Sequence, residues 1–260
     1  MNEIPATRRE HILHRLEQGQ SVNAAALAAE FAVSEDAIRR DLRALATLGL
    51  CRRVYGGALP LSPAVAPMAE RIHHVPQRKA ALARVGAALV QPGELVLLDN
   101  GSSNLALVPL LPAASAITVV TNSITIAAAV LQRSDLQLLM LGGSVDAHVG
   151  GCIDAIALRQ LADLNPDRCF LGACAFSAEQ GISAFHLADA QFKQAALAAA
   201  RHSVVLLTSE KLQTRAPFRV CASAAIECYV LEADAPDVSA QALEQGGSMV
   251  RRAAALPIST

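Results

Sequence analysis

The stretch FAVSEDAIRRDLRALATLG, residues 31–49, predicts a tight turn followed by a helix with one buried face. Ser34 can cap this helix, which runs to about Thr47 and is stopped by Gly49. At the α-helical step of about 100° per residue, its large apolar side chains fall within roughly 40° of one another and form a core stripe. This stripe consists of Ile38, Leu42 and Leu45.

Three arginines lie away from the stripe on the same helix: Arg39, Arg40 and Arg43. They fall about 100°, 200° and 140° from the first residue of the stripe, on the side and far face of the helix. Such arginines can read guanine edges in the major groove of DNA or grip its phosphates. The alternative is a solvated helix whose arginines pair with acids of their own helix, which are Glu35, Asp36 and Asp41.

The flanking residues place this helix in a larger motif. We predict helices over residues 8–17 and 22–31 before it, the second capped by Ser21. Residues 50–59 give a strand signal broken by a Gly-Gly turn, and predict a hairpin. Helices joined by a short turn and followed by a hairpin are typical of a winged helix-turn-helix. We therefore expect DNA contacts from Ser34, Arg39, Arg40, Arg43, Arg52 and Arg53.

Composition bounds the class of protein. The chain has 260 residues, of which 53% are hydrophobic and only 3% aromatic, a mixture that suits a soluble α/β protein. No apolar stretch approaches the roughly 18 to 20 residues that cross a bilayer, and residues 1–10 lack the apolar core of a signal peptide. We expect a cytoplasmic protein without a membrane partner. Because residues 1–60 hold eight arginines against seven acids, DNA binding is argued from where the arginines point.

The six cysteines are scattered, and no two form a CxxC pair. Most lie inside apolar runs, so we expect buried, reduced thiols and predict neither a metal site nor a cofactor.

Four prolines between residues 60 and 76 interrupt any regular structure, which predicts an interdomain linker. After it, short apolar runs alternate with helices of about ten residues, the pattern of βαβ units and a parallel sheet. We expect strands over residues 94–99, 117–121, 136–141, 168–172, 203–208 and 228–231. The predicted organisation is a DNA-binding domain over residues 1–60, a linker over 61–76 and an α/β domain over 77–260.

Two polar turns follow neighbouring predicted strands. Asp99 precedes one turn, Asn100-Gly101-Ser102-Ser103, and Thr121-Asn122-Ser123 forms the other. Backbone N–H groups and hydroxyls at the start of a helix can hold phosphate, although such residues also cap helices for structural reasons. Two such turns at the carboxyl ends of parallel strands mark the usual ligand crevice of an α/β sheet. Lys193 and Lys211 are the natural positive partners, and the alternative for each is a solvated surface lysine.

The N-terminal motif resembles a known family. Residues 31–42, with the pattern VS…IRRDL, and residues 50–58, with R…GGA, are similar to the signature of the DeoR family of bacterial sugar-metabolism regulators. The chain departs from it at Ala37, where many members carry threonine.

The resemblance continues through the second domain, in the two polar turns, in Leu141-Gly142-Gly143 and in the blocks around Gly181, Lys193 and Lys211. It implies an open, mainly parallel α/β sensor domain resembling ribose-5-phosphate isomerase, which binds a phosphorylated sugar or a related metabolite. It also implies that Asp99 holds sugar hydroxyls, and that phosphate is held by Gly101, Ser102, Ser103 and Lys193. Thr208 departs from the family, whose members often carry aspartate there. The full set of expected effector ligands is Asp99, Gly101, Ser102, Ser103, Thr121, Asn122, Lys193 and Lys211.

Two functions are compatible with this pattern. The first is a transcriptional repressor of a sugar or carbon catabolism operon that binds a double-stranded DNA operator as a dimer or tetramer and is relieved by its effector. The second is a sugar-phosphate isomerase-like enzyme, which needs a positioned base. Asp99 and Asp189 are the only obvious candidates, and neither lies in a cluster of acids. We therefore expect a regulator with no catalytic residue.

Overall fold

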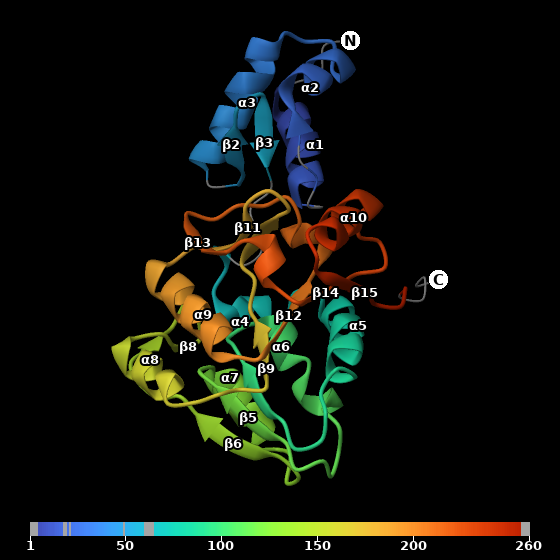
Figure 1. The fold of residues 1–260 in the computed structure, drawn as a ribbon. Helices are drawn as coiled ribbons and strands as arrows, with labels where there is room; N and C mark the ends of the chain where they lie inside the picture. The colour runs from blue at the N-terminus through green and yellow to red at the C-terminus, as the bar shows by residue number, and fades with distance from the viewer. Residues whose placement is uncertain (1–4, 18–19, 21, 49, 60–64, 256–260) are drawn as a thin grey trace. The chain divides into compact units, whose positions relative to one another are not determined.

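The computed structural model describes residues 5–17, 20, 22–48, 50–59 and 65–255. The chain divides into two compact units, Met1–Pro63 and Ala64–Thr260, and each is described by itself (Figure 1).

Three helices and a small antiparallel sheet form the first unit. The helices are α1 (Pro5–Glu17), α2 (Ala24–Glu30) and α3 (Glu35–Thr47). The strands are β1 (Val22–Asn23), β2 (Arg52–Val54) and β3 (Gly57–Leu59), in the order β1-β3-β2. The predicted stripe of α3 is confirmed, since Ile38, Leu42 and Leu45 are at most 3% exposed. They pack with Ile12, Leu16 and Leu27 of the other two helices in one core.

Two local predictions for this unit were wrong. Asn23 caps α2, because its Oδ1 accepts hydrogen bonds from Ala25 N and Ala26 N. Ser21, the predicted cap, lies outside the described residues. The hairpin turns at Tyr55 and Gly56, whose φ is +82°, and Gly57 already belongs to β3. A Cβ on Gly57 would lie 2.0 Å from a carbonyl oxygen of β1. Glycine at this position therefore lets β1 pair with β3.

A seven-stranded sheet forms the centre of the second unit, in the order β15-β14-β12-β9-β4-β5-β6. Every neighbouring pair in it is parallel. Its strands are β4 (Leu95–Leu98), β5 (Thr118–Thr121), β6 (Gln137–Met140), β9 (Arg168–Leu171), β12 (His202–Leu207), β14 (Cys228–Leu231) and β15 (Met249–Arg252). The parallel α/β fold and six of these strands were predicted correctly; β15 was missed, because half of its four residues are arginine.

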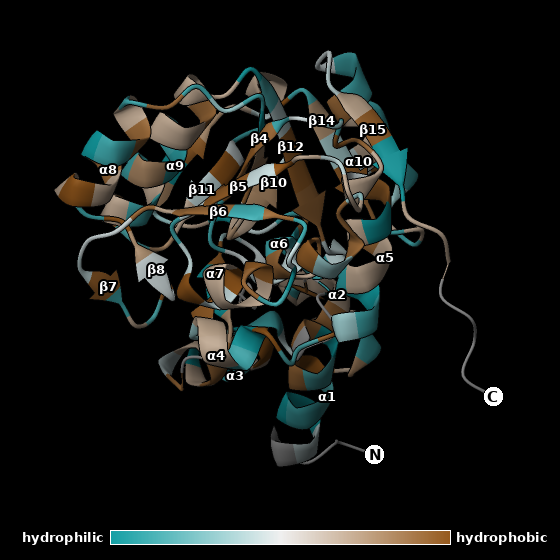
Figure 2. Cartoon of the chain, turned by 90° about the horizontal axis from the view of Figure 1, so that it is seen from below, coloured by the Kyte–Doolittle hydropathy of each residue, from teal (hydrophilic) through white to brown (hydrophobic). Residues whose placement is uncertain are grey.

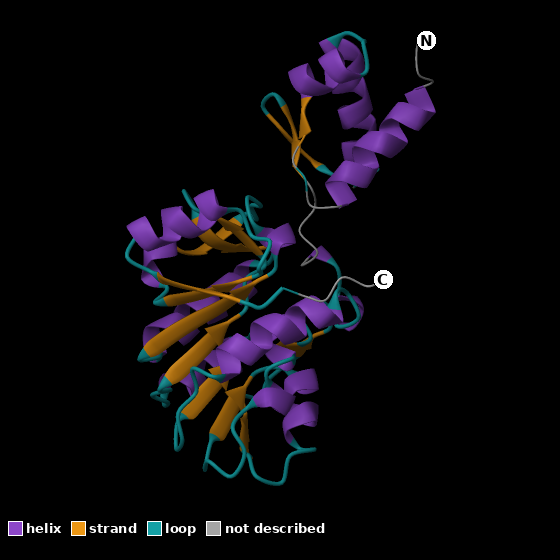
Figure 3. Cartoon of the chain, turned by 90° about the vertical axis from the view of Figure 1, so that its right-hand side faces the viewer, coloured by secondary structure: helices purple, strands orange, loops and turns teal. Residues whose placement is uncertain are grey.

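Helices cover both faces of this sheet, as Figure 3 shows. One face packs against α5 (Pro76–Ala87), α6 (Ser102–Leu105) and α7 (Ile124–Val130). The other packs against α8 (Ala155–Ala162), α9 (Leu187–Ala199) and α10 (Asp237–Gln245). Successive strand residues enter opposite cores, with Leu97 on the second face and Leu98 on the first.

Smaller elements border the sheet and were not predicted. A second, antiparallel sheet has the order β10-β11-β13, formed by Ala175–Ser177, Gly181–Ala184 and Phe218–Cys221. The hairpin of β7 (Val145–Asp146) and β8 (Gly151–Cys152) is separate. Within residues 66–255 the structure also has the 3-10 turns η2 (Val108–Leu110), η3 (Ser209–Lys211) and η4 (Ser223–Ala225). β7, β8 and β10 have only two or three residues, too few to show a pattern, and the apolar residues of β11 and β13 are interrupted by a serine and an arginine.

Part of the predicted linker is ordered on the second unit. A short helix, α4 (Met68–Arg71), lies within residues 61–76. Met68 is 1% exposed, and its N–H donates to the carbonyl of His148. Residues 65–76 therefore pack as part of the second unit, whereas residues 60–64 lie outside the described part. Among the described residues, no helix has both the length and the apolar character to cross a membrane.

Candidate functional site

The first candidate site is the outer face of α3. Ser34 caps this helix, and its Oγ accepts a hydrogen bond of 3.2 Å from Ala37 N. Arg39, Arg40 and Arg43 are all exposed, on the side of the helix away from its core stripe. The helix therefore presents three guanidinium groups to solvent, the arrangement that a major-groove helix needs.

The alternative, in which acids of the same helix neutralise the arginines, holds for one of the three. Arg39 pairs with Glu35 at 2.8 Å and with Asp36 at 3.4 Å. Asp41 instead turns into the core, where Arg8 of α1 donates to it at 2.7 Å. Because Asp41 joins two helices, its charge belongs to the fold rather than to the arginine face.

The hairpin forms the second wall of this face. A groove runs between Glu35, Arg39 and Leu42 of α3 and the hairpin residues 53–57. Arg53 is exposed, Arg52 is half-buried, and Tyr55 at the turn is fully exposed. Of the predicted DNA-binding residues, Arg39 of α3 and Arg53 of the hairpin line this groove together.

The second candidate site is a small pocket at the carboxyl ends of the parallel strands. After β4 the chain runs outward through β5 and β6 on one side, and β9 lies on the other, so the strand order reverses between β4 and β9. Ligands of open α/β sheets bind at such a point. The pocket lies there, lined by residues 100, 101, 103 and 104 after β4, 171–174 at the end of β9, Arg71, Leu206 and Lys211.

Three polar groups in or beside this pocket have no partner among the described residues. The Nε of Arg71, the Oγ of Ser103 and the Oδ1 of Asp99 are buried without a hydrogen bond. Lys211 is 8% exposed, and burial lowers its pKa to about 8, helped by the nearby charge of Arg71. The Arg71 and Ser103 groups are donors beside a desolvated cation, and they favour an anionic ligand that would accept from both, whereas Asp99 Oδ1 is an acceptor that needs a donor.

Lys193 is at the centre of a closed ionic cluster. It is 0% exposed, and its Nζ lies 2.9 Å from Asp99 Oδ2 and 2.6 Å from Asp189 Oδ1. Although burial opposes its charge, the two carboxylates raise the pKa of Lys193. Burial raises the pKa of Asp99, whereas Lys193 holds the pKa of Asp189 below its usual value despite burial. Lys193 therefore supports the loop after β4 and is not among the residues that line the pocket.

The remaining expected ligands either lie in the loop after β4 or hold that loop in place. Gly101 and Ser103 line the pocket, and Ser102 is buried in the first turn of α6. Thr121 donates to the Leu98 carbonyl at 2.7 Å, and Asn122 Oδ1 accepts from Asn100 N at 3.0 Å. Both are fully buried, so they position the loop after β4 from behind.

Sequence reasoning missed Arg71. It lies in the segment predicted as a linker, and the prolines around it masked the helix that carries it. Its position is fixed by Lys79, whose Nζ donates to the carbonyls of Arg71 and His74. The one residue that could have signalled this was Lys79, which is 4% exposed at the start of α5. Its burial, however, is not visible in a sequence.

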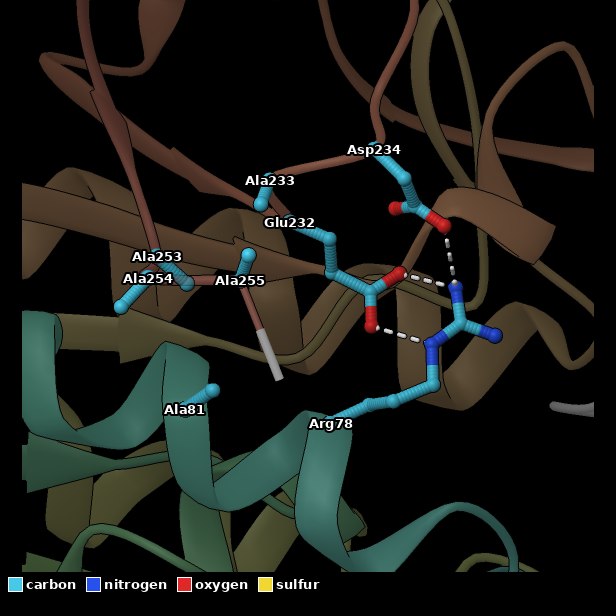
Figure 4. A pocket seen from close by; sticks show the side chains of 8 residues that line it. All are labelled: Arg78, Ala81, Glu232, Ala233, Asp234, Ala253, Ala254 and Ala255. Atoms are coloured by element: carbon cyan, nitrogen blue, oxygen red, sulfur yellow. Dashed lines mark hydrogen bonds and ion pairs between the residues drawn. The ribbon is translucent and has the colours of Figure 1, made fainter. Parts of the chain in front are cut away.

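A third, separate pocket lies against α5 and the end of β14 (Figure 4). Arg78 points at Glu232, with 2.6 Å between Arg78 Nε and Glu232 Oε1, and at Asp234. Glu232 also accepts from Ser209 N. Its polar groups satisfy one another, and the rest of its wall is alanine, so it lacks the unpaired donors of the pocket near β4.

Comparisons with known proteins agree with the division of the chain into two units. The DeoR-like helix-turn-helix domain model matches residues 8–63, and the DeoR C terminal sensor domain model matches residues 74–233. An aga operon transcriptional repressor, as it is named, of Escherichia coli O157:H7 is 29% identical over 92% of this chain and 91% of its own. The glycerol-3-phosphate regulon repressor of Escherichia coli strain K12 is 25% identical over 86% and 90%.

Among solved structures, ribose 5-phosphate isomerase A of Neisseria gonorrhoeae is 12% identical, with 54% of each chain covered and a TM-score of 0.39. That similarity is too weak to support a shared activity. The two family models follow one another along the chain, one in each unit, so the resemblance found in the sequence is confirmed. With its arginine-bearing helix-turn-helix and its sensor domain, this chain belongs to the DeoR family of DNA-binding transcriptional regulators.

Proposed function

We propose that the protein represses a sugar or carbon catabolism operon and releases its operator when a phosphorylated sugar-type effector binds the second unit. The observation that carries the effector class is the pocket beside β4. It combines Lys211, Arg71 and the unpaired hydroxyl of Ser103, and none of the residues lining it is acidic. Two relatives named as repressors, one of them of a glycerol-3-phosphate regulon, support the direction of regulation.

In this proposal the phosphate binds Arg71, Lys211, Ser103 and the loop around Gly101, and Lys193 holds Asp99 in place behind them. Arg71 ends α4, the first helix after the segment that joins the two units. An anion that engages Arg71 therefore acts on the part of the second unit nearest in sequence to the DNA-binding unit. The effector can shift DNA binding only by its difference in affinity for the two states.

We propose binding rather than catalysis at this pocket. An isomerase needs a carboxylate or similar base free to reach a substrate carbon. Both carboxylates considered for that role bind Lys193, and Asp99 also accepts from Gly172 N at 2.8 Å. We also propose an assembly with an even number of copies, because paired operator half-sites need paired readers.

Thermal denaturation of the full chain tests the effector class. We expect sugar phosphates, but not the same sugars without phosphate, to raise the melting temperature. The variant Lys211→Met removes the charge with little change in shape, and should abolish that rise. Arg78→Met is the matched control, since it removes a cation from the pocket in Figure 4 and should keep the response. A phosphate response that survives Lys211→Met but is lost in Arg78→Met would move the effector site to the other pocket.

A further inference from the structure

The two edge strands of the seven-stranded sheet, β6 and β15, differ in how open they are to pairing with another strand. β6 ends the sheet, and no described strand pairs beyond it. Gln137 and Leu141 donate their N–H groups inward, to carbonyls of the chain leading into and ending β5. Because backbone groups alternate along a parallel ladder, those of Leu138 and Met140 face outward. Figure 1 shows β6 at the lower end of the second unit, and Figure 2, seen from below, shows it toward the viewer.

The opposite edge, β15, carries charge. Arg251 and Arg252 are exposed there, and Arg252 pairs with Asp237 of α10 at 2.6 Å. Charged side chains on an edge strand discourage pairing with another chain. By contrast, residues 136–145 hold no charged residue and no proline. One edge is protected and the other is not.

The helix beside β6 continues this apolar surface. α7 packs against β6, and its outer side carries Ile124, 47% exposed, and Leu131, which follows the helix and is 71% exposed. Ala128 between them is also exposed, and no residue from 124 to 132 is charged. Residues at this spacing share one side of a helix. An open strand edge and an uncharged helix face thus lie next to each other.

A second copy of this chain fits such a surface. Two identical edge strands can pair antiparallel about a twofold axis perpendicular to the sheet, because each then offers the same outward N–H and C=O groups to the other. That axis keeps each face of the sheet on its own side. The two copies of α7 therefore come together on one face, and their exposed leucine and isoleucine side chains meet.

We propose that two copies of this chain pair through β6, with α7 packed against α7, to form a continuous fourteen-stranded sheet. The choice of a second copy as the partner rests on the proposed function in one respect. A protein that binds two half-sites of a DNA operator needs a symmetric partner. The strand edge and the α7 face stand without any assumption about the effector.

Molar mass in solution, measured by light scattering on the full chain, tests this proposal. The wild-type protein should have two or four times the chain mass of 27.2 kDa. Leu131→Glu places like charges across the twofold axis and should halve the measured mass. Val238→Glu is the matched control, because this residue of α10 is 66% exposed and lies outside the proposed interface. It should leave the mass unchanged.

A second pair of variants addresses the strand edge itself. Leu138→Lys on β6 should halve the mass, whereas Val250→Lys, equally half-buried on β15, should not. A monomeric wild-type protein, an open-ended series of larger species, or wild-type mass in Leu131→Glu would overturn the proposal. Thermal response to sugar phosphates separates the two ideas, since dissociated variants should keep it if the proposed function holds. Its loss in the wild-type protein would refute the effector but not the interface.

Discussion

The arginines of α3 and the cations of the second unit differ first in their exposure to water. Arg39 keeps 53% of its side chain exposed although it pairs with two acids, whereas Lys193 is 0% exposed between two carboxylates. Exposed cations make weak, exchangeable pairs that a DNA phosphate can replace. Buried cations hold fixed geometry and are costly to leave unpaired. In our proposal the exposed arginines bind a large polyanion, whereas the buried Lys193 holds the loop beside the effector pocket in place.

Removal of the buried charge of Lys193 should have the largest effect of the changes predicted below. Lys193→Met leaves two buried carboxylates without their cation, and we expect it to cost about 3–5 kcal/mol of unfolding free energy. Urea unfolding of the full chain measures this. The control Arg159→Met, on the exposed side of α8, should change it by less than about 0.5 kcal/mol. A loss below about 1 kcal/mol for Lys193→Met would mean that the ionic cluster does not hold the fold.

The exposed cations should behave in the opposite way. Arg39→Ala with Arg40→Ala should leave stability nearly unchanged and weaken operator binding at least about 30-fold, or about 2 kcal/mol, because both contacts to DNA are lost. Fluorescence anisotropy with a duplex selected from a random pool provides the measurement. Arg159→Ala with Arg201→Ala, two exposed arginines of the second unit, controls for net charge. Unchanged affinity in the double variant would remove α3 from the DNA-binding face.

Titration distinguishes Lys211 from every arginine. Burial lowers its pKa to about 8, so its charge is present at pH 7 and is lost as pH rises through 8. A phosphate ester stays dianionic over that range, so its affinity should fall by about tenfold between pH 7 and 9. Lys211→Arg keeps its charge and should flatten the profile. Calorimetric titration at several pH values checks this, and an equally steep fall in the arginine variant would assign the titration to another group.

The smallest expected effect concerns the acids beside Arg39. Glu35→Gln removes a carboxylate that pairs with Arg39 at 2.8 Å and that also repels DNA phosphate. Exposed pairs of this kind are worth about 0.2–1 kcal/mol, so we expect DNA affinity to rise by a factor of about 1.4 to 5. Anisotropy at fixed salt measures it, with Glu179→Gln in the second unit as control. Weaker binding would show that Glu35 orients Arg39 for base contact.

Features that depend on neighbouring residues could be predicted from the sequence, whereas contacts between distant residues could not. Helix periodicity placed Ile38, Leu42 and Leu45 inside and the arginines outside, because a 3.6-residue repeat is a local property. Short apolar runs predicted six parallel strands for the same reason. The alternative that paired Asp41 with arginines of its own helix was wrong for this residue, since its partner Arg8 lies 33 residues away.

The candidate effector site was harder to predict. The loop at Gly101 and Ser103 and the charge of Lys211 were found from turns after strands. The pairing of Lys193 with Asp99 spans 94 residues, and Arg71 reaches the pocket from a proline-rich segment. Both depend on tertiary packing, which no local pattern encodes.

Coupling between the two anion sites is the central claim, and DNA affinity measured with and without a stabilising sugar phosphate tests it most directly. The account predicts at least tenfold weaker operator binding in the presence of the ester for the wild-type protein, and no change for Lys211→Met, with equal affinities when the ester is absent. An operator affinity that stays constant while the same ester raises the melting temperature of the wild-type chain would contradict it.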